Sequence, residues 1–333
     1  MRLPLCVSIV LAVIVATTGA ATGATDMTVR IGTVMAPPLV PVLIAQEEGF
    51  FAREGVRVDI VPFSNIGTVR QALLNHDVDV AVLSVGMTLQ AFDQGIKLQN
   101  LVLLQGRPNA TIITDKRLKI RKGDFNALRG RRIGVDAHGG RVDVLLRLVL
   151  LEAGINPDLK VTIIPTGEIS GHLAAMRARR VDAQVTWEPG TSQLTLPSQL
   201  GLGEVFLDMR GNDRPYPISR IVEGSLVALD EWVRDHRDAA VRIARAVSCA
   251  EHTIRTHPNL IARIYQQSFP GLGPEVYANI AKVQPSVYWP RITKENIVVM
   301  NEAYRKLGLL KGTVRFEDVV RNDFVQAWWG ECR

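Results

Sequence analysis

In this 333-residue chain, the side chains best suited to contact a small ligand gather in six short stretches. Hydroxyl and amide groups in some of these stretches offer neutral hydrogen bonds. Glycines in another let backbone N–H groups approach an anion at a helix start, and an aromatic ring in the last can stack on a ligand. The candidate binding residues are Met35, Pro37, Ser64, Asn65, Ser84, Gly86, His138, Gly139, Gly140, Arg141, Trp187 and Glu188.

Several of these residues also have a plainer role that the sequence leaves open. Ser64, like Thr68, lies near a predicted helix start, where the alternative is N-capping. His138 or Arg141 could add positive charge to an anion site, but His138 could equally be exposed on a tight turn. Trp187 could stack on a ligand or simply cover the core.

Catalytic motifs are absent from the sequence. It contains no GxxxxGK[ST] phosphate loop, no GxGxxG after a predicted strand, no HExxH zinc motif and no GxSxG nucleophile elbow. The six histidines are not spaced as metal ligands, and the three cysteines form no CxxC pair. The sequence therefore predicts a protein that is not an enzyme and has no catalytic residues, metal or cofactor.

The elements that position the candidate stretches alternate between strands and helices. Residues 27–34 are β-rich with alternating apolar side chains, and helix, strand, helix and strand follow within about 60 residues. Pro41 can sit in the first turn of the first helix, and Gly49 can supply the left-handed residue that ends it. Short connections and mostly apolar strands predict a parallel sheet with helices on its faces.

The same pattern restarts at residue 131. A predicted strand over 131–137 leads into the clearest amphipathic helix of the chain, 140–155. The segment VDAQVTWEPG (181–190) then repeats the helix-turn-strand step that VDVAVLSVG (78–86) makes in the first unit. We therefore predict an α/β fold with two similar lobes. Because ligands bind beyond the C-terminal ends of parallel strands and at domain interfaces, the candidate residues should line a cleft between the lobes.

Helical patterns dominate the C-terminal third of the chain. Residues 232–258 predict one long helix. Residues 316–330 also look helical, with Trp328 and Trp329 tying a final helix onto the body, whereas 215–229 look like an extended segment that returns from one region to the other. The expected domain boundaries are a signal peptide at 1–24, lobe one at 25–114 and 218–333, and lobe two at 115–217.

The first 24 residues have the features of a cleaved secretory signal peptide. Arg2 precedes an apolar run, and small residues that suit a peptidase follow it. The alternative is an uncleaved membrane anchor, for which the apolar run is short. Export predicts a periplasmic location, where an oxidising environment permits a bridge between Cys249 and Cys332 without requiring one.

The net charge of +6 is mild for this length and indicates no nucleic-acid partner. Basic residues are scattered except for a cluster between 116 and 134, which is either an anion-attracting or partner-binding surface or a solvated loop. Glu188 could accept hydrogen bonds from an amine-bearing ligand or be a solvated rim. Arg107 and Arg220 lie near the expected crossings between the lobes, where they could reach the cleft or form interlobe ion pairs.

Four segments together resemble a known family. They are IAQEEGFFAREGVRVDIV, ALLNHDVDVAVLS, LRGRRIGV and MRARRVDAQVTWEP. They resemble bacterial ABC-transporter substrate-binding proteins of the nitrate/sulfonate/taurine/thiamine-pyrimidine group, and the resemblance covers residues 28–330. It implies the type II periplasmic binding fold, in which two α/β lobes joined by two crossings close on a ligand by hinge motion.

The resemblance also implies a function. Five of the candidate stretches match positions that line the family's cleft, although many members have Ser or Thr where this chain has His138, Gly139, Gly140 and Arg141. We expect an extracytoplasmic solute-binding protein that captures a small polar or anionic organic ligand, of the sulfonate, nitrate-like or pyrimidine-like class. The expected protein is a monomer that delivers its ligand to an ABC permease in the inner membrane.

Two alternatives remain from the sequence. The first is a periplasmic ligand-sensing module that reports to a membrane partner. The second is an enzyme on the same fold, such as the family's pyrimidine-synthase relatives. The resemblance implies that those enzymes rely on a Cys-rich iron motif, which this chain lacks.

Overall fold

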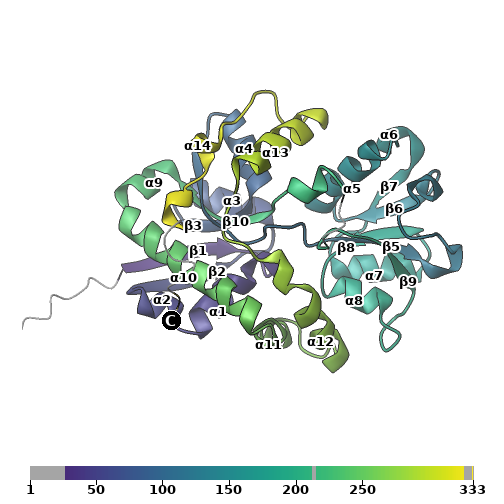
Figure 1. Ribbon diagram of the computed structural model, residues 1–333, viewed down its shortest axis with the longest axis horizontal. Coiled ribbons are helices and arrows are strands. Elements are labelled where there is room, and N and C mark those ends of the chain that lie inside the picture. Colours follow the sequence, from purple (N-terminus) through teal and green to yellow (C-terminus); the bar gives the residue numbers. More distant parts are fainter. Residues whose placement is uncertain (1–26, 212–214, 326–331, 333) are drawn as a thin grey trace, which may run out of the picture.

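The computed structural model describes residues 27–211, 215–325 and 332. Two five-stranded sheets, each flanked by helices, form two lobes that lie side by side (Figure 1), which confirms the predicted α/β class. The predicted signal peptide, together with Trp328 and Trp329, lies outside the described residues. None of the helices within them is long and apolar enough to cross a membrane.

The first sheet has the strand order β2-β1-β3-β10-β4. β1 (Met27–Thr33) pairs in parallel with β2 (Val56–Pro62) and with β3 (Val80–Ser84). β10 (Gly224–Leu229) runs antiparallel between β3 and β4 (Leu98–Leu103). The sheet is therefore mixed rather than parallel, because one of its strands enters only after the chain has completed the second lobe.

The helices of this sheet are α1 (Val40–Glu47), α2 (Phe50–Arg53), α3 (Ile66–Leu74) and α4 (Val85–Asp93). They include the two that the sequence predicts, α1 and α3, and two that it does not, α2 and α4. Gly49 has a φ of 71° between α1 and α2, as the sequence predicts, and Phe50 and Phe51 are buried beneath the end of α1. α4 starts directly after β3, so the candidates Ser84 and Gly86 lie at a helix start.

The second sheet repeats this arrangement with the order β7-β6-β8-β5-β9. β6 (Arg132–Val135) is parallel to β7 (Thr162–Pro165) and β8 (Ala183–Thr186). β5 (Thr111–Asp115) runs antiparallel between β8 and β9 (Gly203–Asp208), in the place that β10 takes in the first sheet. The expected lobe boundary between 114 and 115 is therefore displaced, because all of β5 pairs in the second sheet.

The helices of the second lobe include the one predicted most clearly. They are α5 (Arg141–Glu152), α6 (Pro157–Lys160), α7 (Ile169–Arg177) and α8 (Gly190–Thr195). The predicted apolar face of α5 is buried throughout, since none of its members is more than 2% exposed. These members are Val142, Leu145, Leu146, Val149 and Leu150.

The C-terminal helices cover the first lobe. They are α9 (Asp230–Asp235), α10 (Arg237–Thr256), α11 (Asn259–Ser268), α12 (Pro274–Val283), α13 (Lys294–Lys306) and α14 (Phe316–Val319). Short 3-10 turns are η1 (Pro37–Leu39), η2 (Lys116–Leu118), η3 (Phe125–Leu128), η4 (Ile218–Arg220), η5 (Pro285–Val287) and η6 (Asn322–Phe324).

Two C-terminal predictions need correction. The single helix expected over 232–258 is divided at His236, where ψ is 38° instead of a helical value. The helix expected from residue 316 ends after α14 and is followed by η6, because the backbone at Val320 is extended. Cys249 on α10 forms a disulfide with Cys332, so the bridge that the sequence left open is present.

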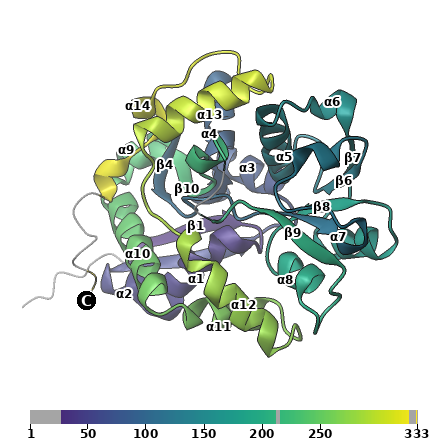
Figure 2. The same cartoon turned by 45° about the vertical axis from the view of Figure 1, so that its right-hand side comes forward.

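The lobes are joined by two chain crossings, between β4 and β5 and between β9 and β10. A second contact forms where α12 meets α8, below the crossings in Figure 2. There the Asn279 side-chain amide donates to the Ser192 hydroxyl oxygen at 2.9 Å. Gln199 Nε2 donates to the Leu272 carbonyl at 3.1 Å. The C-terminal helices therefore bridge both lobes.

Candidate ligand-binding site

Glu223, just before β10, lies where the two crossings meet. Its N–H donates to the Gln105 carbonyl of the other crossing at 2.9 Å. Its carbonyl accepts from the N–H of Val85, at the start of α4, at 2.8 Å. The Glu223 side chain is only 4% exposed. The backbone thus fixes a carboxylate at the junction of the lobes.

This carboxylate holds Arg141, the first residue of α5 in the second lobe. Arg141 Nη1 donates to both Glu223 oxygens, at 3.1 and 2.9 Å, and the Asn109 N–H donates to Oε2 at 2.9 Å. Hydrogen bonds between charged groups are the stronger kind, so this pair orients the guanidinium. Within the described chain, Arg141 Nε and Nη2 make no hydrogen bond, and the side chain is 30% exposed. One edge of the guanidinium is therefore available to another acceptor.

Trp187 extends this cluster from the end of β8. The Arg141 guanidinium carbon lies 5.0 Å from the centroid of the indole ring, within the range of a cation–π contact. The ring is only 8% exposed, and His172 of α7 meets it edge-on, with centroids 4.9 Å apart. Trp187 therefore covers the second core, as one of the two sequence alternatives expected, and it also supports the arginine.

His172 is buried and neutral at physiological pH. Its Nδ1 lies 2.9 Å from the Thr186 hydroxyl oxygen. Burial lowers the pKa of His172 to about 4, and the positive charge of Arg141 acts in the same direction. The imidazole thus adds no positive charge beside the arginine at neutral pH.

Two buried amides on the first crossing lack partners. Gln105 and Asn109 are each 1% exposed, and the side-chain oxygen and nitrogen of both make no hydrogen bond to the described residues. Buried polar atoms are normally satisfied, so these four atoms are candidates to bind a polar ligand. The sequence analysis missed both residues, because a lone amide in a segment between two strands carries no motif.

Gly86, a candidate binding residue, has a packing role. It lies in the first turn of α4, and a Cβ at this position would come within 1.9 Å of the Tyr304 hydroxyl on α13. Burial raises the pKa of Tyr304, as does the nearby Glu223 carboxylate, so its hydroxyl stays protonated. Ser84 caps α4, since its Oγ accepts from the Met87 N–H at 3.2 Å.

The remaining candidates of the first lobe are not joined to the Arg141 and Glu223 pair by any of the contacts described below. Asn65 is the N-cap of α3, accepting from the Thr68 N–H at 3.0 Å and donating to Ser64 Oγ at 3.3 Å. The N-capping alternative is therefore realised, by Asn65 rather than Ser64. Met35 is half exposed after β1, and the Pro37 carbonyl accepts from the Tyr288 hydroxyl at 3.4 Å.

The glycine turn before α5 forms its own hydrogen bonds instead of an open anion cradle. The Gly139 N–H donates to Asp143 Oδ2 at 2.7 Å, and the Gly140 N–H donates to the Ala137 carbonyl at 3.0 Å. These N–H groups are therefore occupied by the chain itself, which argues against the predicted backbone site for an anion. His138 is exposed on the turn and lines an open hollow of about 510 Å³ between α5 and the end of α13.

Glu188 is fully buried, so the solvated-rim alternative is wrong. Its Oε1 accepts from Arg210 Nη1 at 2.8 Å, and its Oε2 accepts from the Ser192 N–H at 3.0 Å. Arg210 also binds Asp208, at 2.9 Å. Both oxygens of Glu188 are therefore committed to holding the start of α8 against β9, which leaves neither for a ligand.

The two arginines expected near the crossings stabilise the fold. Arg107 Nη1 donates to the Arg210 carbonyl at 2.9 Å, across the crossings. Arg220 Nε pairs with Glu295 of α13 at 2.6 Å on the surface. Neither contact points to a ligand. Among the described residues, no group of three or more His, Cys, Asp or Glu side chains could hold a metal ion.

The structure thus joins two of the predicted residues, Arg141 and Trp187, into one cluster with residues that the sequence did not single out. We call this set the crossing cluster; its members are Gln105, Asn109, Arg141, His172, Trp187, Glu223 and Tyr304. Glu223 carried a weak signal, since it is the one acid in the returning segment 215–229. His172 and Tyr304 carried none.

Comparison with known proteins identifies a family and several relatives of this chain. A model of the NMT1-like family matches residues 22–266. The chain is 27% identical over 108 residues to 4-amino-5-hydroxymethyl-2-methylpyrimidine phosphate synthase of Uromyces fabae, covering 32% of this chain and 31% of that protein. It is 23% identical over 241 residues to the nitrate/nitrite binding protein NrtA of Nostoc sp., covering 66% of this chain and 52% of NrtA. The alignments thus span about a third and about half of these relatives.

The fold is also found in solved structures. The periplasmic aliphatic sulphonate binding protein SsuA of Escherichia coli matches with a TM-score of 0.71 at 16% sequence identity. The match covers 91% of this chain and 100% of SsuA. At this identity the likeness shows a shared fold and nothing about the crossing cluster.

Proposed function

Because the chain belongs to the NMT1-like family, we propose that it is the extracytoplasmic solute-binding protein of an ABC importer. It captures a small polar or anionic organic molecule between its lobes by hinge closure and delivers it to a permease in the inner membrane. It acts as a periplasmic monomer after removal of its signal peptide, and it binds its ligand without transforming it.

One observation carries the proposal. Arg141 is oriented by Glu223 at the point where both crossings meet, and one edge of its guanidinium remains available. That edge can donate two parallel hydrogen bonds to a pair of acceptor atoms. A ligand group bound there would contact Arg141 on α5 of the second lobe, and Arg141 is itself paired with Glu223 at the two crossings. Binding would therefore favour one relative position of the lobes over others.

The chemistry of the crossing cluster limits the ligand class. Glu223 already neutralises Arg141, so the site favours a ligand with one small oxyanion or an acceptor-rich ring over a multiply charged anion. The Gln105 and Asn109 amides can each donate and accept, which suits a polar heterocycle or a sulfonate with further polar groups. The names of the relatives, which include sulphonate, nitrate and pyrimidine proteins, support this range.

A thermal-shift panel tests the proposal. The chain from residue 25 onward is unfolded and refolded to remove carried ligand, then scanned against sulfonates, nitrate, carboxylates, aromatic acids and aminopyrimidines. A ligand at 100 times its Kd should add about 2.7 kcal/mol to the free energy of unfolding, a shift of a few degrees. We expect a saturable shift with one class, and recovery of that compound chemically unchanged.

Variants locate the site. Arg141→Gln and Trp187→Ala should abolish the shift, whereas the matched controls Arg129→Gln and Trp232→Ala, outside the crossing cluster, should retain it. No shift with any class would contradict solute capture. A shift that persists in Arg141→Gln would place the ligand elsewhere. Conversion of the compound during incubation would refute the non-enzymatic part of the proposal.

A further inference from the structure

The positive charge of this protein is concentrated in one short segment. Residues 115–132 hold eight Lys or Arg and two Asp, a net charge of +6, which equals the net charge of the whole chain. The remaining 315 residues therefore hold 31 basic and 31 acidic side chains. The molecule is thus electrically balanced except at this segment, which creates a directed field.

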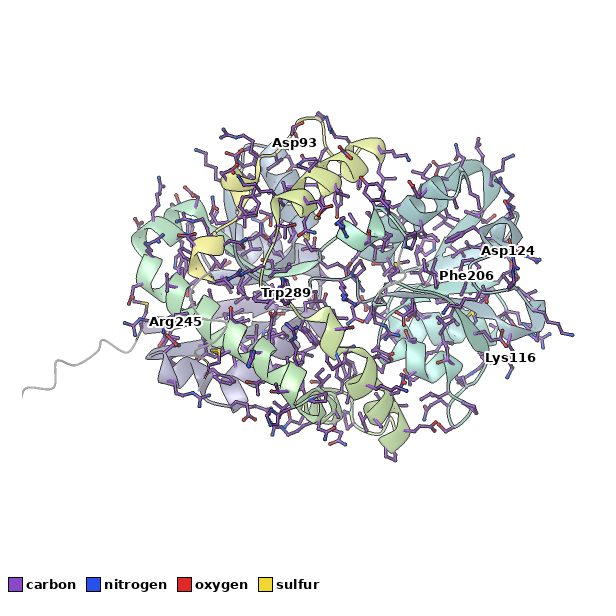
Figure 3. All side chains as sticks on the ribbon, in the orientation of Figure 1. Asp93, Lys116, Asp124, Phe206, Arg245 and Trp289 are labelled. Atoms are coloured by element: carbon purple, nitrogen blue, oxygen red, sulfur yellow. A yellow bond between two sulfur atoms is a disulfide. The ribbon has the colours of Figure 1, made fainter. Side chains whose placement is uncertain are left out.

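The fold places the segment at one end of the molecule. It comprises the end of β5, the turns η2 and η3 and the start of β6. Lys116 and Asp124 mark its position in Figure 3, at the end of lobe two that faces away from lobe one. Apart from Arg131, which is half-buried, every Lys and Arg side chain of the segment is exposed.

Internal ion pairs leave much of this charge unmatched. Asp115 pairs with Arg117, and Asp182 of the neighbouring strand connection pairs with Arg132. No side-chain hydrogen bond or ion pair joins Lys119, Arg121 or Lys122 to another described residue. These cations are free to face a negatively charged surface.

An exposed leucine lies beside the segment. Leu159 on α6 is 76% exposed, more than the other exposed large apolar residues among the described positions. Its neighbour Lys160 is also exposed, and the Lys160 carbonyl accepts from the Gly130 N–H at 2.7 Å, which joins α6 to the segment. Asp158 is occupied by Arg147 at 2.7 Å. An apolar side chain therefore projects next to cations.

We propose that this basic end, defined as the exposed cations of 116–132 with Leu159 and Lys160, docks on anionic phospholipid headgroups. Diffuse cations on several loops suit a lipid surface, which offers many mobile phosphates, better than a shaped acidic pocket. A single projecting leucine can enter the headgroup boundary without a matching groove. Docking would hold the protein against the bilayer that contains its proposed permease. This role goes beyond solute capture and does not depend on it.

Vesicle co-sedimentation tests the proposal. The chain from residue 25 onward, which contains every described residue, is mixed with phosphatidylcholine vesicles or with vesicles that hold one part phosphatidylglycerol to three parts phosphatidylcholine. We expect binding only to the anionic vesicles. Each cation near such a surface strengthens binding by about fivefold. Salt screens this attraction by shortening the range of the field, so binding should weaken by about tenfold or more between about 50 and 300 mM salt.

Charge-reversal variants separate the basic end from net charge. Arg121→Glu, Lys122→Glu and Lys160→Glu together should weaken binding by about tenfold or more. The control Lys97→Glu, Lys282→Glu and Lys311→Glu makes the same change in net charge at exposed lysines outside the basic end. It should leave binding within about threefold, because the field falls off within a Debye length. Leu159→Ser should weaken binding severalfold without changing its salt dependence.

Two results would overturn the proposal. One is the absence of binding to anionic vesicles at low salt by the wild-type chain. The other is an equal loss in the two triple variants, which would make the attraction a property of net charge alone. Thermal unfolding of each variant checks that it is folded. The ligand panel uses none of these side chains, so the two proposals can fail independently.

Discussion

Lowering the pH from 7.5 to 5 should destabilise this protein through one side chain, His172. The imidazole is fully buried against Trp187, and its Nδ1 is held at the Thr186 hydroxyl. Burial, aided by the charge of Arg141, lowers its pKa to about 4. The ordinary pKa of an exposed histidine is about 6.5, and the unfolded chain should have this value.

The sign and size of the effect follow from proton linkage. Between pH 6.5 and pH 4 the unfolded chain binds a proton that the folded chain refuses, so the free energy of unfolding falls as the pH falls. The contribution is fully present above about pH 6.5. The loss reaches about 2 kcal/mol at pH 5 and about 3 kcal/mol below pH 4, since one pKa unit corresponds to about 1.4 kcal/mol.

Urea unfolding of the wild type and of His172→Gln at pH 7.5, 6 and 5 measures this loss. Carboxylates that titrate over the same range affect both proteins equally. The difference in free energy between them should therefore shrink by about 2 kcal/mol from pH 7.5 to pH 5. Asn126→Gln, at an exposed position without a titratable group, is the control and should keep a constant difference from the wild type. If the difference for His172→Gln stays constant within about 0.5 kcal/mol, the assignment of a buried neutral imidazole is refuted.

Three further predictions concern stability and use the same urea assay. Glu188→Gln should lower the free energy of unfolding by about 3 kcal/mol, because it removes a charge partner from the buried Arg210. The control Glu204→Gln, at an exposed position of β9, should lower it by under about 0.5 kcal/mol. Equal losses in the two variants would contradict the buried pair. Replacing both Cys249 and Cys332 by serine should cost about 4 kcal/mol, since the bridge closes a loop of 83 residues, and a loss below about 1 kcal/mol would contradict this estimate. Gly86→Ala should be destabilising because its Cβ would lie 1.9 Å from the Tyr304 hydroxyl, and adding Tyr304→Leu should restore part of the loss.

Local sequence patterns predicted most of the order of helices and strands in the two α/β units. The repeated strand-helix-strand units, the end of α1 at Gly49 and the buried face of α5 were all readable, because each depends on hydrogen bonds or periodicity within a few residues. The pairing of the strands that enter each sheet from the other part of the chain was not predicted, although β10 lies in the predicted extended segment 215–229. β5 and β10 are short apolar runs whose partners lie far away in sequence.

The candidate site was predictable only in part, for the same reason. Arg141 and Trp187 could be found, since ligands gather where parallel strands end. Glu188 stood out in the sequence but serves a buried ion pair. Gln105 and Asn109 were invisible, because what distinguishes them is burial without a partner, and burial is a tertiary property.

By itself, the sequence determined the α/β class, the two units and the resemblance that led to a family, because apolar periodicity and turn residues act over short distances. Only the tertiary structure decided that Arg141 meets Glu223, 82 residues later, at the junction of both crossings. That pairing depends on the chain leaving and re-entering the first sheet, which brings a helix start of one lobe against the returning strand of the other. The charge of residues 115–132 was legible in the sequence, but its concentration at one end of the molecule came from the fold.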